Sequence, residues 1–200
     1  MVNYSEIFNE QGMDYQTYRA LVDQLLLEGK STSEASYDLH YTKMNVQRMN
    51  RVDKTVSLTD DLISTINQLK GNYKFLVITE GWCGDAAQII PVFNKIATAS
   101  LGRIDLKFVL RDKNLPLIDA HLTNGGRAIP VLIVLNESAD QVLATWAPRP
   151  KILQELLKEW KKETIEMPIL AEKLHGWYAK DKTQSTQAEL NELLKGLEFN

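Results

Sequence analysis

The stretch that decides the fold is Thr79-Glu80-Gly81-Trp82-Cys83-Gly84-Asp85-Ala86, which holds the only cysteine of the 200-residue chain. The apolar run Phe75-Leu76-Val77-Ile78 precedes it, and a helical pattern from Ala86 to Ala99 follows it. Cys83 is therefore expected at the point where a buried strand turns into a helix. The first N–H groups of a helix lack partners within the helix and carry partial positive charge, which favours the thiolate of a cysteine placed there.

Hydrophobic periodicity on both sides of this turn predicts the remaining elements. Amphipathic helical patterns cover Thr59 to Lys70 and Leu115 to Leu122, and a third pattern starts at Pro150. Apolar runs predict strands at residues 73–78, 104–110, 131–135 and 141–146. The resulting order, strand-helix-strand-helix-strand-strand-helix, predicts an α/β fold: a mixed central sheet with helices on both faces.

The turn and the start of the third strand carry a family resemblance. Trp82-Cys83-Gly84 at a strand-to-helix turn resembles the active-site turn of the thioredoxin superfamily, whose motif is Trp-Cys-Gly-Pro-Cys. Asp85 stands in place of that proline, and Ala86 stands in place of the second cysteine. Ile129-Pro130 resembles the family's cis-proline loop, which faces the nucleophilic cysteine. The resemblance covers about residues 56–163 and implies a thioredoxin-like fold with a cis bond before the proline.

Two helical segments flank this thioredoxin-like domain of residues 56–163. Residues 1–55 are expected to form a helical N-terminal extension, and residues 164–200 a helical C-terminal extension. The segment 45–51 contains Arg48 and Arg51, which are interpreted as part of a solvent-facing helix surface because arginines are mostly exposed. The alternative is a helix that leans over the cysteine and contributes an arginine to it.

Composition argues against several classes of partner and cofactor. The net charge is −3 without a block of like charge, so we expect neither nucleic acid nor membrane as a partner. No apolar run approaches the ~18 residues that span a bilayer. The three histidines show no metal-ligand spacing and no glycine-rich phosphate loop occurs, so we expect no metal and no cofactor. The lone cysteine and an N-terminal region without signal-peptide features favour a cytoplasmic protein.

The resemblance also implies a set of site residues, with Cys83 as the nucleophile. The expected substrate-binding residues are Trp82, Gly84, Asp85, Arg127, Ile129 and Pro130. The backbone of Ile129 is expected to offer strand-like hydrogen bonds to an extended peptide. Arg127 either supplies positive charge, which would favour the thiolate or bind a carboxylate such as that of glutathione, or it is a solvent-exposed turn residue.

The chain departs from the family pattern in ways that bear on chemistry. Ala86 cannot resolve a mixed disulfide, so a second, external thiol would be needed. The family's buried acid, six residues before the nucleophile, is replaced by Val77. Glu80 is a possible substitute for that acid, but we expect it to be exposed. Asp85 suits the first turn of a helix, but its charge would repel a neighbouring thiolate.

Two hypotheses follow from these residues. The first is monothiol thiol–disulfide exchange in redox homeostasis, an oxidoreductase-like role. Cys83 would act on a protein or a low-molecular-weight disulfide, and an external thiol such as glutathione would complete the reaction. The alternative is a redox-inactive module that binds peptides or proteins through the groove between Cys83 and Pro130. The turn context favours the first hypothesis.

Overall fold

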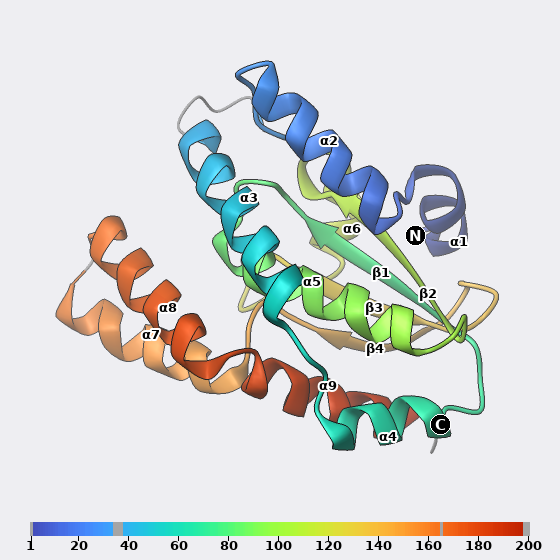
Figure 1. The fold of residues 1–200 in the computed structure, drawn as a ribbon. Coiled ribbons are helices and arrows are strands. Elements are labelled where there is room, and N and C mark those ends of the chain that lie inside the picture. The colour runs from blue at the N-terminus through green and yellow to red at the C-terminus, as the bar shows by residue number, and fades with distance from the viewer. Residues whose placement is uncertain (1, 34–37, 165, 198–200) are drawn as a thin grey trace.

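A four-stranded mixed sheet lies at the centre of the computed structural model, which describes residues 2–33, 38–164 and 166–197 (Figure 1). The strands of the described chain are β1 (Tyr73–Thr79), β2 (Ile104–Leu110), β3 (Val131–Leu135) and β4 (Val142–Trp146). Their order in the sheet is β2-β1-β3-β4. The β1–β2 pair is parallel, and the pairs β1–β3 and β3–β4 are antiparallel. The α/β fold predicted from the sequence is confirmed.

Burial along the strands shows that both faces of the sheet are covered. Every residue of β3 is buried, and in β1 only Lys74 is less than fully buried. Successive side chains of a strand point to opposite faces, so an unbroken apolar run fits a sheet packed on both sides. On the edge strand β2, Met13 exchanges backbone hydrogen bonds with Phe108 at 2.9 and 2.7 Å, which pairs part of the edge with the chain's own N-terminal region.

Helices make up most of the rest of the described chain. In the N-terminal half they are α1 (Tyr4–Glu6), the π-helical turn η1 (Ile7–Gln11), α2 (Tyr15–Leu27), α3 (Asp38–Thr55), α4 (Asp60–Gln68) and α5 (Gly84–Ala99). After β2 come the 3-10 turn η2 (Arg111–Lys113), α6 (Leu115–Asp119), α7 (Lys151–Glu163), α8 (Met167–Asp181) and α9 (Gln184–Leu197). Within the described residues, none of these helices is both long and apolar enough to cross a membrane.

The central helix α5 starts at the cysteine turn and is enclosed by other elements. Cys83 is its N-cap residue, and Pro91 lies within it. Helix α3 runs alongside α5, as Figure 1 shows, and α2 packs against α3 and β2. The N-terminal helices therefore cover the same part of the fold that presents the cysteine.

The C-terminal helices pack onto the domain as well. Helices α7 and α8 form an antiparallel pair, and α9 lies against α4 (Figure 1). Gln187 on α9 donates to the backbone oxygen of Ser57 at 3.0 Å and accepts from the backbone N–H of Thr59 at 2.8 Å. Leu190 and Leu194 of α9 are buried. These contacts join residues that are about 130 positions apart in the sequence.

The loop that leads into β3 lies directly against the cysteine turn. The Ile129–Pro130 peptide bond is cis, and so is the Ala147–Pro148 bond after β4. The Cys83 thiol donates a hydrogen bond to the backbone oxygen of Ile129 at 3.3 Å. Residues 46 positions apart thus form the floor of one site.

Candidate functional site

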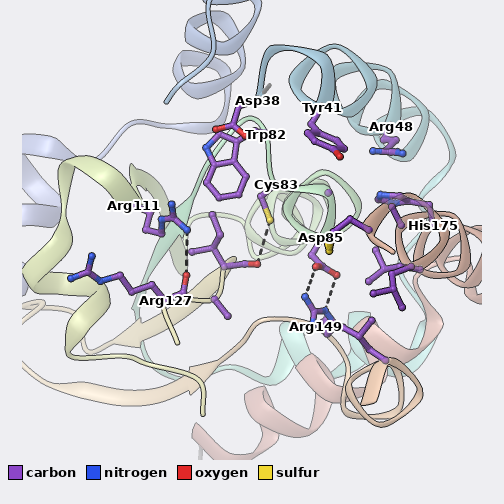
Figure 2. Close-up of a pocket in the computed structure, with 18 of the residues that line it drawn as sticks. Asp38, Tyr41, Arg48, Trp82, Cys83, Asp85, Arg111, Arg127, Arg149 and His175 are labelled. Carbon is purple, nitrogen blue, oxygen red and sulfur yellow. Dashed lines mark hydrogen bonds and ion pairs between the residues drawn. The ribbon is translucent and has the colours of Figure 1, made fainter. Parts of the chain in front are cut away.

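A pocket of about 920 Å3 opens over the cysteine turn (Figure 2). The cysteine turn forms its floor, and its walls come from α3, the loops after β2 and before β3, and the α7–α8 pair. Figure 2 shows Cys83 in the middle, with Trp82 and Arg111 on one side and Arg48 and His175 on the other. Elements from the whole length of the chain therefore meet at the predicted turn.

The Cys83 sulfur is enclosed and held as a thiol. Its residue is 7% exposed, it donates to Ile129, and it accepts a hydrogen bond from the Ala86 N–H at 3.5 Å. Burial, together with the negative charge of Asp85, raises the pKa of the thiol to about 12. The helix N-terminus was expected to favour the thiolate, but here the hydration lost on burial outweighs it.

Asp85 is the centre of a buried charged network. Its carboxylate accepts two hydrogen bonds from Arg149, from Nε at 3.0 Å and from Nη2 at 2.6 Å. The Tyr178 hydroxyl donates to the same carboxylate at 2.6 Å, and burial with the Asp85 charge raises the Tyr178 pKa well above its ordinary value. Asp85 was expected as a first-turn acid and as a substrate-binding residue, and it does line the pocket. In the structure it joins α5 to the loop before α7 and to α8.

Gly84 and His175 lie in direct contact on the α8 side of the pocket. A Cβ atom at Gly84 would lie only 2.8 Å from the His175 ring, so a glycine is needed for α8 to approach this closely. The Gln88 side-chain amide donates to Nδ1 of His175 at 3.2 Å. Burial lowers the His175 pKa to about 4, helped by the positive charges of Arg48 and Arg51, so the ring is neutral at pH 7.

Helix α3 contributes an arginine to the pocket. Arg48 is half-buried and lines the pocket, and its Nη1 donates to the side-chain oxygen of Asn45 at 2.7 Å. The Asn45 amide in turn donates to the backbone oxygen of Gly81 at 3.1 Å. For Arg48 the solvent-facing interpretation is wrong, because Arg48 lines the same pocket as Cys83, although the cation whose charge acts on the thiol is Arg149. Arg51, one turn later, is exposed and bonds Gln88 at 2.8 Å.

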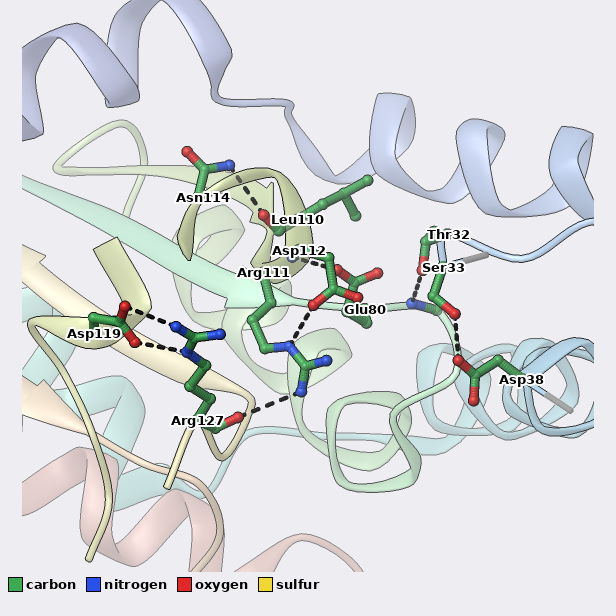
Figure 3. A network of polar contacts seen from close by, with 11 residues as sticks. Thr32, Ser33, Asp38, Glu80, Leu110, Arg111, Asp112, Asn114, Asp119 and Arg127 are labelled. Atoms are coloured by element: carbon green, nitrogen blue, oxygen red, sulfur yellow. Dashed lines mark hydrogen bonds and ion pairs between the residues drawn. The ribbon is translucent and has the colours of Figure 1, made fainter. Parts of the chain in front are cut away.

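The opposite rim carries two more arginines. The Arg111 guanidinium lies over the Trp82 ring, 4.7 Å from its centroid, a cation–π contact. Arg127 lines the pocket but is about half exposed, and it forms a two-pronged ion pair with Asp119 at 2.6 and 2.8 Å (Figure 3). Its positive charge is therefore already balanced by a carboxylate of α6.

Of the expected residues in the proline loop, one lines the pocket and the other does not. Ile129 and its neighbour Ala128 line the pocket. Pro130 is buried, and the pocket lining does not include it. The backbone oxygen of Ile129 accepts a hydrogen bond from the Cys83 thiol. This oxygen, at the position expected to bond an extended peptide, therefore already has a partner within the protein.

Glu80 differs most from its expected place. It was predicted to be exposed, but its exposed fraction is 0%. Figure 3 shows its carboxylate between the Asp112 and Thr32 segments, where Oε1 accepts the Asp112 N–H at 3.0 Å. Burial raises the Glu80 pKa to about 7. The prediction failed because α2 and the segment that follows it cover this turn, which the local sequence does not indicate.

Sequence reasoning missed Arg149 and Tyr178, and it gave His175 no role. Arg149 stands between Pro148 and Pro150, which restrict the backbone on both sides. This restriction was the sequence feature that could have indicated a fixed position for Arg149. Tyr178 and His175 lie in the segment expected to be an extension. Among the described residues no group of three potential ligands could hold a metal ion.

The fold and the cysteine turn together define a thioredoxin-type domain. A family model described as thioredoxin matches residues 31–161, more than half of the chain. The chain therefore belongs to this thioredoxin family. None of the curated proteins matches it.

Two solved structures resemble the chain over nearly its whole length. A crystal structure of a protein of unknown function from Pseudomonas aeruginosa is 17% identical, with a TM-score of 0.64, and the match covers 98% of this chain and 99% of that one. An HIV epitope scaffold is 16% identical, with a TM-score of 0.62 and the same coverage. At these identities the likeness concerns the fold alone, and function has to be argued from the site.

Proposed function

We propose that this protein is a binding module on the thioredoxin fold, which holds a small molecule or a peptide segment over Cys83 without thiol–disulfide exchange. The observation that carries the proposal is the pocket of about 920 Å3 with the buried sulfur of Cys83 at its floor. Ligand sites of this size are usually concave, partly apolar and supplied with a few fixed polar groups. A lone cysteine without a disulfide partner suits the reducing cytoplasm, where we place the protein.

The surroundings of the sulfur argue against exchange as the main activity. Attack on a disulfide requires the thiolate, and a thiol with a pKa of about 12 supplies very little of it at pH 7. The Asp85 carboxylate stays beside the sulfur because Arg149 and Tyr178 hold it. Ala86 offers no second thiol to release a mixed disulfide.

Monothiol exchange is the second candidate, since Cys83 does line the pocket. In that reaction the Cys83 thiolate attacks a substrate disulfide, the S–S bond breaks, and one substrate sulfur leaves as a thiolate. An external thiol such as glutathione then attacks the mixed disulfide and regenerates Cys83. This activity would need ligand binding to expose the sulfur or to lower its pKa.

A direct test of the proposal measures mixed-disulfide formation with glutathione disulfide by intact-protein mass spectrometry. At pH 7.5 we expect the folded protein to stay unmodified for hours, while the same protein unfolded in urea reacts readily. Fast modification of the folded protein would contradict the proposal and support monothiol exchange.

A binding measurement complements this reaction. Ligand affinity should be the same for the natural protein and for Cys83→Ser, because binding without exchange does not use the sulfur as a nucleophile. A ligand that binds the natural protein but not the serine variant would argue against the proposal.

A further inference from the structure

The cations of the pocket are not all balanced by acids. Five Arg and Lys side chains and three Asp side chains line it. Arg111, Arg127 and Arg149 each form an ion pair, with Asp112, Asp119 and Asp85 respectively. Within the described part of the chain, neither Arg48 nor Lys161 forms an ion pair, and Lys161 is exposed. Arg48 is therefore the half-buried cation of the pocket whose charge no described carboxylate balances.

The environment of Arg48 makes this unbalanced charge costly without a ligand. Burial lowers its pKa, and the nearby charge of Arg51 lowers it further. Within the described part of the chain its guanidinium donates one hydrogen bond, to the neutral side-chain amide of Asn45, which in turn donates to the backbone oxygen of Gly81. A guanidinium has five N–H donors, so most of those of Arg48 remain available. Figure 2 shows Arg48 next to Tyr41 and His175 at the α3 side of the pocket.

An apolar wall forms another side of the same pocket. It consists of Leu157 on α7 with Met167, Leu170 and Leu174 on α8. Met167 is 65% exposed, whereas Leu170 and Leu174 are buried. An exposed methionine beside buried leucines offers an adaptable apolar contact surface.

We propose that the ligand is an amphiphilic carboxylate, whose anionic group binds Arg48 and whose apolar body lies against Leu157 and Met167. This inference rests on the proposed binding function and adds the chemical class of the ligand. A carboxylate matches the planar fork of a guanidinium through two parallel hydrogen bonds. Two sources supply this chemistry: a short fatty acid and a peptide C-terminus with apolar residues.

Calorimetric titration with matched pairs of probes tests the inference. Octanoate and 1-octanol share the apolar body, but only octanoate carries the charge. Acetyl-Ala-Leu-Leu with a free C-terminus and its carboxamide form the corresponding peptide pair. We expect each carboxylate to bind and each neutral partner to bind at least about tenfold more weakly, the effect of one charge-assisted contact. The tighter of the two carboxylates identifies the source.

Substitutions locate the interaction on the protein. Arg48→Gln should weaken carboxylate binding at least about tenfold and leave the weak binding of 1-octanol unchanged. Arg48→Lys keeps the charge and should restore much of the affinity. Lys43→Gln is the matched control, since it removes one charge from an exposed position of α3 outside the pocket. Met167→Gln should weaken octanoate and 1-octanol alike.

The outcomes separate this inference from the proposed function. Equal affinities for octanoate and 1-octanol, or an unchanged octanoate affinity of Arg48→Gln, would overturn the inference that the ligand is an amphiphilic carboxylate. Neither result would contradict the proposed binding function. Absence of binding by both carboxylates would also overturn it. Fast mixed-disulfide formation at Cys83 would instead remove the proposed function, whatever the titrations show.

Discussion

Substitution of Glu80 by Gln should stabilise this protein at alkaline pH and change little at acid pH. Glu80 is fully buried, and its carboxyl has a pKa of about 7 in the folded protein against an ordinary value of 4.5. The folded chain therefore binds more protons than the unfolded chain between these two values. The free energy of unfolding must decrease as the pH rises through this window, because the buried carboxyl then has to ionise without water.

The size of this effect follows from the two pKa values. The difference between 4.5 and about 7 corresponds to roughly 3 kcal/mol, at about 1.36 kcal/mol per pKa unit. Glutamine has the same shape and keeps an oxygen to accept the Asp112 N–H, but it has no charge to bury. We therefore expect Glu80→Gln to be more stable than the natural protein by ~3 kcal/mol at pH 8. A gain of this size raises the melting temperature by ~6–12 °C in a chain of this length.

Urea unfolding at pH 4.5 and pH 8, followed by circular dichroism, measures the difference between the two proteins. Glu172→Gln is the control, because Glu172 is exposed on α8 and loses the same charge. We expect the free energy of unfolding of Glu172→Gln to equal that of the natural protein at both pH 4.5 and pH 8. A Glu80→Gln protein with the same relative stability at pH 4.5 and pH 8 would refute the burial of an ionisable carboxyl at this position.

Three further predictions concern the pocket floor. Arg149→Met should cost about 3–5 kcal/mol in urea unfolding because it leaves the Asp85 carboxylate buried and without its ion pair. The double variant with Asp85→Asn should recover most of the lost stability. An Arg149→Met protein as stable as the natural protein would show that the Arg149–Asp85 ion pair does not stabilise the fold. The His175 imidazole should titrate by NMR near pH 4, and a midpoint above 6 would contradict its burial beside two arginines. Cys83→Ser should unfold within about 1 kcal/mol of the natural protein, because serine can also donate to Ile129, and a loss above ~3 kcal/mol would contradict this.

The sheet and the cysteine turn could be predicted because their signals are local. The apolar run before Thr79 and the helical spacing after Ala86 lie within one window of the chain. Both faces of β1 and β3 are covered, which is what their unbroken apolar sequences indicate. Of the two cis peptide bonds in the described part of the chain, the one before Pro130 lies at the position that the family resemblance indicated, whereas the one before Pro148 had no such signal.

The electrostatics of the site could not be predicted because they depend on distant segments. Asp85 pairs with Arg149, 64 positions later, and with Tyr178, 93 positions later, and no periodicity links these residues. The pKa of Cys83 is raised because its sulfur is buried beside Asp85, and the local sequence indicates neither effect. The same is true of Glu80, whose burial depends on a segment about fifty residues earlier.

The position of α8 has a consequence for how the protein matures during synthesis. Helix α8 supplies His175 to the pocket and the Tyr178 hydroxyl to the Asp85 carboxylate, yet it is translated after every strand of the sheet. A nascent chain that has already folded its sheet would still hold Asp85 without its tyrosine and Gly84 without the histidine above it. Domains generally fold from the N-terminal side as they leave the ribosome. We therefore expect the proposed binding pocket to be completed late, when α8 packs against a sheet that has already formed.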